Sequence, residues 1–450
     1  MEIRDLKEKI FEAGKEIGFE DMEINYISNK KFNCKVFDNS IDSYNISVEG
    51  GLSFRGVFNN KMGYSYTEKV DETSIELLLK KAKENAQVIE NDDIEEIFPG
   101  SPVYEKVDIF SQEFAEVSIE EKMQLLINLS QKVKMLDKRV DKVLFNLYED
   151  HESTRMIFNT KGLSKVEKGN IGIIYFSLLV KDSKDSKSSD ILKVTRDFKD
   201  FNYEEMAKRV VDEAINLLGA EAVKSKEYPI LLRNTAAASL LQTFIGAFSA
   251  ENVQQGRSLL KNKLGEAIAS HNITIIDNPH MKDKMASRTF DSEGVATKKC
   301  IVVEEGLLKT YLHNLKTAKK DGVTPTGHGY RNSYKGTLSI APTNFFIETG
   351  DNEYDDLVAS IKEGLIIIEL EGLHAGANGI SGDFSLAAKG YYVKNGKIEK
   401  PVNHITIAGN FYDLLKDVEA VGNDLDFAFP SESYVGSPSL LISKLAISGD

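Results

Sequence analysis

The sequence predicts an α+β protein. An N-terminal α+β domain with a mostly antiparallel sheet is expected over residues 1–222, followed by a β-rich C-terminal domain over residues 223–450. Helical and strand periodicities succeed one another in the first half, and strand–turn–strand patterns fill the second. A chain of 450 residues is also too long to fold around a single ordinary hydrophobic core. Two domains are therefore expected, with a boundary near residues 221–227.

The first expected element is an amphipathic helix. Leu6, Ile10, Ala13 and Ile17 recur at i, i+4, i+7 and i+11, and Gly18 follows as a residue that commonly ends a helix. This spacing places the four apolar side chains on one face. We therefore expect the helix to pack against the sheet that follows it.

Alternation of apolar and polar residues then predicts strands. Residues 22–26 and 43–48 alternate in this way, as half-buried strands do. Gly50-Gly51 is expected to form a turn before a further strand at residues 52–54. The pattern favours an antiparallel arrangement, with one face of the sheet against a core.

Two helices follow, each with a recognisable start. Thr73 with Glu76, and Ser118 with Glu121, form capping-box signatures for helices that end near residues 88 and 135. A third helix is expected over residues 203–219, because its apolar residues recur on one face. Those residues are Met206, Val210, Val211, Ala214 and Leu217.

Two stretches of the first half are expected to be exposed connectors. Residues 91–103 combine two prolines with a run of acidic side chains, and residues 181–190 consist largely of Lys, Asp and Ser. In the second half, turn signals occur at Asn278-Pro279, Glu305-Gly306, Gly322 and Asn395-Gly396. The last is the clearest hairpin, because both of its central residues tolerate positive φ.

Composition limits the function. The formal net charge is −14, from 70 acidic and 56 basic residues, which disfavours direct binding to nucleic acid. The start of the chain lacks the apolar core of a signal peptide, and the longest apolar stretches, residues 171–180 and 364–370, are too short to cross a bilayer. With Cys34 and Cys300 as the only thiols, we expect a cytoplasmic, reduced protein that does not associate with membranes.

No local motif for hydrolytic chemistry is found. The seven histidines have no short ligand spacing, a G-x-S-x-G nucleophile elbow is absent, and the glycine spacing after His374 lacks the strand and helix that a dinucleotide site requires. Residues 240–247 are expected to form a helix that could carry zinc ligands. Its polar side chains are instead the amide of Gln242 and the hydroxyl of Thr243, neither of which holds zinc or acts as a base.

Several segments of the second half, in kind, order and spacing, resemble the TldD/PmbA family of bacterial and archaeal proteins, and its PmbA (TldE) branch in particular. The resemblance covers nearly the whole chain. The segments that carry it are Pro229-Ile230-Leu231-Leu232, Thr235-Ala236-Ala237-Ala238, the helix expected over residues 240–247, Lys263-Leu264-Gly265-Glu266, Asp277-Asn278-Pro279-His280, Phe290 to Thr297, Gly372 to Ser385, Tyr392 to Ile398, Pro401-Val402, Thr406 to Asn410 and Gly436 to Ile442.

The resemblance implies a cytosolic proteolytic assembly, in which a TldD-type subunit carries an H-E-x-x-x-H helix and a late cysteine as its zinc site. In this chain the two histidines and the glutamate of that helix correspond to Gln242, Ala247 and Thr243, and the expected cysteine is missing from residues 427–435. We call Gln242, Thr243 and Ala247 the zinc-motif positions. We therefore expect no catalytic residue, metal or other cofactor in this chain, and zinc in a TldD-type partner. Family members have carried a gyrase-modulator label, which the acidic composition does not support as direct DNA binding.

The resemblance also suggests where a peptide could lie. The glycine-rich segment around His374, together with Asp383 and Phe384, could line a peptide cleft; the alternative is a tight β-rich corner in which Asp383 caps a turn. His328 lies in a loop of Thr, Pro and Gly that could contact a bound chain, although a simply exposed loop is the expected structure.

Three hypotheses for function follow. The first is a PmbA/TldE-like subunit of a TldD-type zinc protease that binds unfolded polypeptides or peptide precursors and helps to form the chamber. The second is an independently active peptidase with an unrecognised site. The third is a stand-alone peptide-binding homodimer. On the first hypothesis the partner is a TldD-type subunit in a heterodimer, although the purified chain could also pair with itself.

Overall fold

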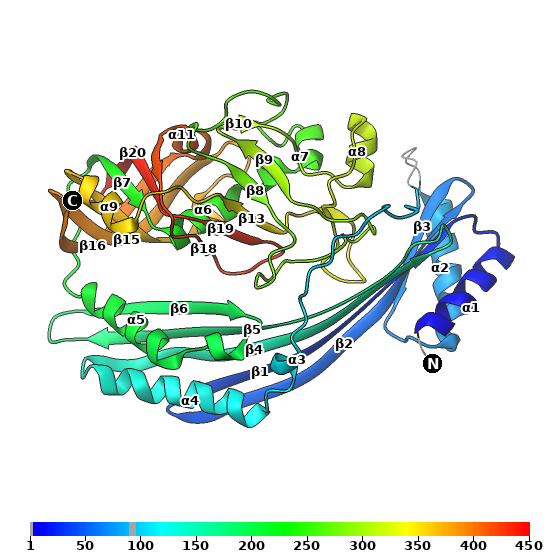
Figure 1. Cartoon of the computed structure of the whole chain (residues 1–450), viewed down its shortest axis with the longest axis horizontal. Coiled ribbons are helices and arrows are strands. Elements are labelled where there is room, and N and C mark those ends of the chain that lie inside the picture. The colour runs from blue at the N-terminus through cyan, green and yellow to red at the C-terminus, as the bar shows by residue number, and fades with distance from the viewer. Residues whose placement is uncertain (1–2, 90–95) are drawn as a thin grey trace.

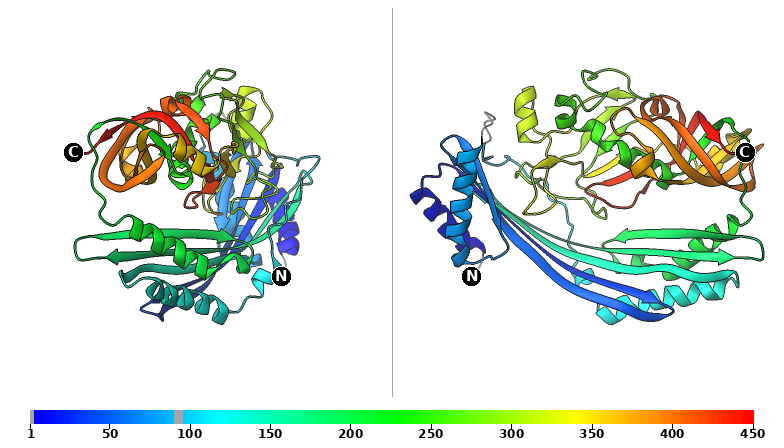
Figure 2. Two further views of the ribbon diagram at one scale, coloured as in Figure 1. Left: turned by 60° about the vertical axis from the view of Figure 1, so that its left-hand side comes forward. Right: turned by 180° about the vertical axis from the view of Figure 1, so that it is seen from behind.

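The computed structural model describes residues 3–89 and 96–450. A long, curved antiparallel sheet forms the N-terminal half, and the C-terminal half lies along its concave side (Figures 1 and 2). The predicted α+β class is confirmed, with an antiparallel N-terminal sheet and a strand-rich C-terminal half.

The N-terminal sheet has the strand order β3-β2-β1-β4-β5-β6, and every neighbouring pair is antiparallel. Four of its strands have 16 to 20 residues, and the curved sheet that they form extends along most of the molecule (Figure 1). The strands are β1 (Met22–Phe37), β2 (Ser40–Phe58), β3 (Lys61–Thr67), β4 (Val140–Asn159), β5 (Ser164–Lys181) and β6 (Ser186–Thr195).

The turn expected at Gly50-Gly51 does not exist. Strand β2 continues through both glycines, which pair with Ser28 and Ile27 of β1. A Cβ atom at Gly50 would lie 2.8 Å from the Ile27 carbonyl oxygen, and one at Gly51 would lie 2.5 Å from the ring of Tyr334. These glycines therefore mark places where other groups approach the strand closely, which sequence alone does not distinguish from a turn.

The connector expected over residues 181–190 is also wrong for most of its length. Lys181 pairs with Ser186 as β5 turns directly into β6, so only residues 182–185 form the loop. The polar residues from 186 onward belong to β6, which is an edge strand of the sheet. Edge strands tolerate charged and polar side chains, and this explains the misleading composition. Part of the other predicted connector, residues 91–95, lies outside the described residues; residues 96–103 contain no helix or strand.

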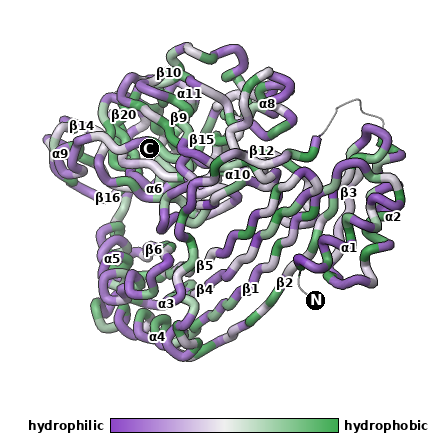
Figure 3. Tube along the Cα trace, turned by 45° about the vertical axis from the view of Figure 1, so that its right-hand side comes forward, coloured by the Kyte–Doolittle hydropathy of each residue, from purple (hydrophilic) through white to green (hydrophobic). Residues whose placement is uncertain are grey.

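Helices cover the two ends of the sheet separately (Figure 3). At one end, α1 (Ile3–Glu16) and α2 (Ile75–Val88) enclose a core that includes Met22 and Phe54. At the other end, α4 (Ile119–Leu136) and α5 (Tyr203–Asn216) enclose a core around Tyr148 and Phe176, with α3 (Gln112–Ala115) beside it. The predicted helices are confirmed, and the apolar face predicted for α5 is buried.

The helix starts agree only in part with the capping signatures. The capping box of Ser118 and Glu121 is present at the start of α4. Before α2, Asp71 instead caps a short 3-10 turn, η1 (Glu72–Ser74), by accepting a hydrogen bond from the backbone N–H of Thr73. Because this turn precedes the α-helix, the side chain of Thr73 does not cap it.

The C-terminal half contains a sheet of order β16-β15-β14-β7-β20-β17, in which β16 also pairs with β20 and so closes the sheet on itself. A second sheet has the order β10-β9-β8-β13-β19-β18. The strands of the first are β7 (Lys226–Leu232), β14 (Glu363–Glu371), β15 (Asp383–Lys394), β16 (Lys397–Asn410), β17 (Val418–Val421) and β20 (Leu440–Ser448). Those of the second are β8 (Ile275–Asp277), β9 (Cys300–Glu304), β10 (Leu307–Leu308), β13 (Asn344–Ile347), β18 (Asp426–Phe427) and β19 (Tyr434–Ser437), and β11 (Gly329–Tyr330) pairs separately with β12 (Ser339–Ile340).

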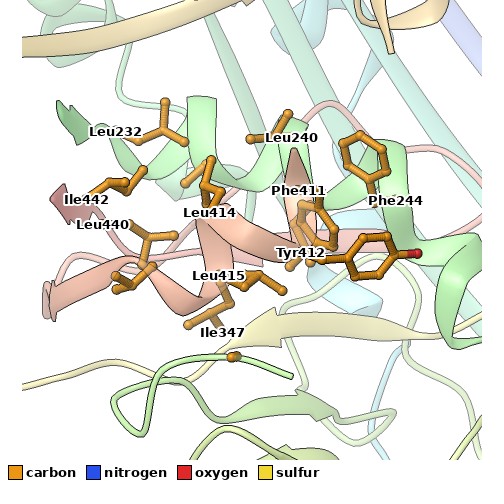
Figure 4. Packing of buried hydrophobic residues seen from close by; sticks show 14 of the residues in the cluster. Leu232, Leu240, Phe244, Ile347, Phe411, Tyr412, Leu414, Leu415, Leu440 and Ile442 are labelled. Atoms are coloured by element: carbon orange, nitrogen blue, oxygen red, sulfur yellow. The ribbon is translucent and has the colours of Figure 1, made fainter. Parts of the chain in front are cut away.

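A large hydrophobic core joins these two sheets. Helix α6 (Asn234–Phe244) and helix α11 (Phe411–Lys416) contribute to it, and the rings of Phe244 and Phe411 stack with their centroids 4.5 Å apart (Figure 4). The other helices of this half are short: η3 (Ile245–Phe248), α7 (Ala250–Gln254), α8 (Leu315–Asp321), α9 (Tyr354–Ser360) and α10 (Leu373–Gly376).

Most of the turn signals in this half are confirmed. Glu305-Gly306 joins β9 to β10 and Asn395-Gly396 joins β15 to β16, with positive φ at all four residues. Gly322 is different, because it ends α8 as a left-handed C-cap with φ of 67°. A glycine at positive φ is suited both to a hairpin turn and to the end of a helix. The presence of glycine therefore does not show whether a strand or a helix precedes it.

Cys34 and Cys300 are unpaired and buried. Burial raises the pKa of Cys34 to about 11 and that of Cys300 to about 12, so both thiols stay protonated near neutral pH. Within residues 3–89 and 96–450, no helix combines the length and apolar character needed to cross a membrane.

Candidate functional site

Helix α6 presents different chemistry on its two faces. Leu240, Leu241 and Phe244 are buried in the C-terminal core. Gln242 and Thr243 are half-buried on the other side. The α-helix ends at Phe244, so Ala247 lies in the 3-10 helix η3, where it is 1% exposed. The helix expected over residues 240–247 therefore begins earlier, at Asn234, and its α-helical part ends earlier, at Phe244.

The side chain of Gln242 holds the loop between β18 and β19. Its Nε2 atom donates hydrogen bonds to the Phe429 carbonyl oxygen over 3.0 Å and to Ser431 Oγ over 2.9 Å. The tertiary structure thus brings Gln242 beside residues 427–435, the segment in which the resemblance places a cysteine. Residues that are more than 180 positions apart in the sequence meet here.

The groups at this place do not fit zinc. Gln242 supplies an amide engaged as a donor, Thr243 donates its hydroxyl to the Ser239 carbonyl oxygen over 3.0 Å, and Ala247 supplies only a methyl group. Zinc in proteins takes thiolate, imidazole or carboxylate ligands. In the part of the chain that the structure describes, no group of three or more His, Cys, Asp or Glu side chains is arranged to hold a metal ion.

Residues of the segment 426–434 also line two cavities between the halves of the molecule. A cavity of about 300 Å³, the arginine cavity, lies between strands β4 and β5 and the C-terminal loops, and includes Arg155, Arg196 and Arg288 in its lining. The second cavity, of about 220 Å³, is lined by Thr235 and Ser239 of α6 and by residues of β6, α5 and β14. The loop that Gln242 holds therefore forms a wall of both.

The three residues predicted near the glycine-rich segment lie in different environments. His374 is exposed on the short helix α10. Asp383 is exposed at the start of β15, where it accepts hydrogen bonds from Ser381 Oγ over 2.8 Å and Asn410 Nδ2 over 2.9 Å. These contacts lower the pKa of Asp383 and join the turn before β15 to the end of β16. Phe384 is 4% exposed and belongs to the hydrophobic core.

The exposed loop expected around His328 is wrong. His328 is 1% exposed, with Nε2 2.9 Å from Asp277 Oδ2 and Nδ1 2.8 Å from Thr326 Oγ1. Asp277 also accepts hydrogen bonds from the backbone N–H and the hydroxyl of Thr343. Both ring nitrogens have partners, so His328 joins buried elements. Nothing in the local sequence distinguishes this buried histidine from an exposed one.

The segment 290–297 forms a joint between the two halves, which sequence reasoning did not assign. Asn25 Nδ2 donates to the Ser292 carbonyl oxygen over 3.4 Å, and Arg55 Nη1 lies 4.0 Å from Glu293 Oε1. Arg55 also pairs with the buried Glu23, its Nη2 atom lying 2.7 Å from Glu23 Oε1. Burial, and then the neighbouring charge of Asp291, raise the pKa of Glu293 to about 8.

Comparisons with known proteins agree with this architecture. The PmbA/TldA metallopeptidase C-terminal domain matches residues 225–449, the central domain of the same family matches residues 112–218, and its domain 1 matches residues 22–86. An uncharacterised protein of Methanocaldococcus jannaschii is 30% identical over 91% of this chain and 93% of its own length. The metalloprotease PmbA of Escherichia coli is 26% identical over 74% of this chain and 71% of its own length.

Two solved structures are also similar. A Thermotoga maritima protein described as a candidate modulator of a DNA gyrase has a TM-score of 0.92 and 34% identity, over 99% of this chain and 100% of the other. TldE from Thermococcus kodakarensis has a TM-score of 0.90 over 99% of this chain and 100% of the other; at 22% identity it is similar in fold.

The fold and the matched segments define a metallopeptidase-related chain, built from a long antiparallel sheet and a strand-rich C-terminal half. The chain belongs to the PmbA/TldD family, whose named members include PmbA, TldD and TldE proteins.

Proposed function

We propose that this chain is the PmbA/TldE-type, non-hydrolytic subunit of a zinc-dependent protease, in which a TldD-type partner supplies the zinc site. The observation that carries this proposal is the pair of hydrogen bonds from Gln242 to Phe429 and Ser431. At the place where the resemblance expects metal ligands, an amide and a hydroxyl bind one another. Neither group is a zinc ligand or a general base at neutral pH.

This chain's own part is binding and exclusion. The two cavities lie between the N-terminal sheet and the C-terminal half, where an extended polypeptide could enter while a folded protein would be too wide. The substrates are accordingly unfolded polypeptides and peptide precursors. Because Cys34 and Cys300 are unpaired, we assign the assembly to a reducing compartment, the cytoplasm.

The test is reconstitution with a TldD-type subunit from the same organism. The two chains are purified separately and together, and mass, zinc content and cleavage of an unstructured peptide are measured for each. We expect a complex containing both chains, zinc in proportion to the TldD-type subunit, and cleavage that requires both. A TldD-type subunit that forms no complex with this chain, or that cleaves equally well without it, would refute the proposal.

The same measurements separate the two alternatives. Zinc at one ion per chain together with chelator-sensitive cleavage by the isolated protein would show an independently active peptidase. A homodimer that binds peptide, without cleavage and without affinity for the TldD-type subunit, would show a stand-alone binding protein.

A further inference from the structure

The lining of the arginine cavity holds Arg155, Arg196 and Arg288 against two carboxylates, those of Glu167 and Glu432. Arg196 and Arg288 are 5% and 7% exposed, yet the hydrogen-bond acceptors of both guanidinium groups are main-chain carbonyls. Arg196 donates to Lys282, Lys284 and Asn170, and Arg288 donates to Pro342 over 3.1 Å. Nearby carboxylates offset part of this charge, among them Asp283 for Arg196 and Asp277 for Arg288, but the hydrogen bonds of both guanidinium groups go to main-chain oxygens. A buried charge is most stable when a carboxylate also accepts its hydrogen bonds.

Arg288 gives the clearest indication of a missing ligand. Its Nε atom is buried and has no hydrogen-bond partner. Burial, and then the nearby charge of Arg155, lower the pKa of Arg288. Two guanidinium groups that repel one another, one of them with an unused donor, lie in the lining of the same cavity. An anion between them would supply the acceptor and relieve the repulsion.

The remaining lining selects the kind of anion. Arg155 Nη1 lies 3.7 Å from Glu167 Oε2, and Glu432 also lines the cavity. These two carboxylates would repel a multiply charged phosphate or a nucleic acid backbone. A single carboxylate carries less charge, so these two side chains repel it less, and it matches the planar guanidinium fork.

The apolar part of the lining fits a piece of polypeptide. Ile109, Ile171, Met285 and Tyr434 also line the cavity, and its volume of about 300 Å³ is at the lower end for ligand pockets. It would take a carboxylate together with a neighbouring side chain, and no long segment.

We propose that the arginine cavity binds a carboxylate of an extended polypeptide, either the C-terminal carboxylate or that of an acidic side chain, through Arg155 and Arg288. Arg196 is hydrogen-bonded to main-chain carbonyls, so it adds positive potential to the cavity without binding the carboxylate directly. The inference rests on the proposed function for its substrate class. It identifies the carboxylate as the group of the unfolded substrate that the cavity holds. It requires neither zinc nor a partner, so it can be tested on the isolated full chain.

The test compares three fluorescent, unstructured peptides of the same length by anisotropy. The first has a free C-terminal carboxylate, the second is C-terminally amidated and neutral, and the third is amidated with one internal Glu. We expect the first or the third to bind at least about tenfold more tightly than the neutral peptide, as for a charge-assisted bidentate contact. The tighter of the two identifies the source of the carboxylate. Equal binding of all three, or no binding of any, would overturn the proposal.

Variants then locate the site. R288Q and R155Q should each abolish the preference for the carboxylate, whereas R257Q, which changes an exposed arginine outside the cavity lining, should keep it. R155Q guards against a folding defect of R288Q, because Arg155 is the more exposed of the two; circular dichroism checks both. If both variants fold and retain the preference, the cavity is not the site. Such a result would refute the carboxylate site but not the proposed role in a protease, because cleavage with the TldD-type subunit is measured separately. Conversely, failure to form a complex with the TldD-type subunit would refute the proposed role but not the preference of the isolated chain for a carboxylate.

Discussion

The side-chain amide of Gln242 and the hydroxyl of Ser431 are joined by a 2.9 Å hydrogen bond that fastens helix α6 to the loop between β18 and β19. The residues are 189 positions apart in the sequence. The same amide also donates to the Phe429 carbonyl oxygen, so Gln242 acts as a structural tie for a loop that lines both cavities.

The first prediction concerns this tie. In a complex with a TldD-type subunit, the double variant Q242A/T243A should keep peptide cleavage within about threefold of the wild type, because neither side chain takes part in proton transfer or metal binding. Loss of the hydrogen bonds should lower the free energy of unfolding of this chain by about 1 kcal/mol. Steady-state cleavage and chemical denaturation measure the two effects. Replacing the zinc-site glutamate of the TldD-type subunit is the control that should abolish activity, and an equal loss in Q242A/T243A would contradict the assignment.

A chelator should leave the isolated chain unchanged. Since Gln242, Thr243 and Ala247 offer no zinc ligands, removing metal ions should not alter the Tm by more than about 1 °C, whereas a structural metal contributes directly to folding free energy. Differential scanning fluorimetry with and without EDTA tests this. A fall of several degrees, reversed by added zinc, would reveal a metal site built from scattered residues.

Stability should depend on pH through Glu293. Its pKa is raised to about 8 in the folded protein, chiefly by burial, while the unfolded chain has the ordinary value of about 4.3. Between these values the folded state holds a proton that the unfolded state has released. The contribution of Glu293 is therefore fully present at acidic pH and is lost as pH rises toward about 8.

The variant E293Q tests this assignment. In the wild type, Glu293 Oε2 accepts a 2.8 Å hydrogen bond from the backbone N–H of Leu315. The amide oxygen of glutamine can accept the same hydrogen bond, but the amide does not titrate. The difference in Tm between E293Q and the wild type should grow in favour of E293Q as pH rises from about 5 to about 8. A difference that is constant across this range would show that Glu293 does not titrate there.

Gly51 should be required where the C-terminal half meets strand β2. A Cβ atom at Gly51 would lie 2.5 Å from the ring of Tyr334, so G51A should destabilise the protein by about 1–3 kcal/mol, as overpacking does. The variant Y334A removes the obstructing ring, and the double variant G51A/Y334A should lose less stability than the sum of the two single variants. Chemical denaturation of the four proteins gives the coupling energy; a coupling of zero would mean that the ring moves aside without cost.

Phe244 should be essential for the C-terminal core. Its ring is fully buried and stacks on Phe411, so F244A should cost about 3–5 kcal/mol by leaving a cavity between α6 and α11. The matched control is F37A, since Phe37 is 68% exposed on the N-terminal sheet and its loss should change stability by less than about 0.5 kcal/mol. Comparable losses in the two variants would contradict the position of the core.

The sequence predicted the elements whose periodicity is local. The apolar faces of α1 and α5, the capping box of Ser118, and the Asn395-Gly396 hairpin all depend on residues within a few turns of one another. The predictions at Gly50-Gly51, at residues 186–190 and around His328 were wrong because Gly, Ser, Lys and His have more than one structural use. Which use applies depends on what packs against them, and this is decided by residues distant in the sequence.

By itself, the sequence determined the α+β class, the family and the absence of zinc-ligand side chains at Gln242, Thr243 and Ala247, because these follow from residue type and local order. Only the tertiary structure showed that Gln242 meets Ser431, that Glu293 is buried at the joint between the halves, and that Arg155, Arg196 and Arg288 line one cavity. The physical reason is that charge and hydrogen bonding act through space. Side chains more than a hundred positions apart acquire a common function only when packing removes water and brings them within a few ångströms.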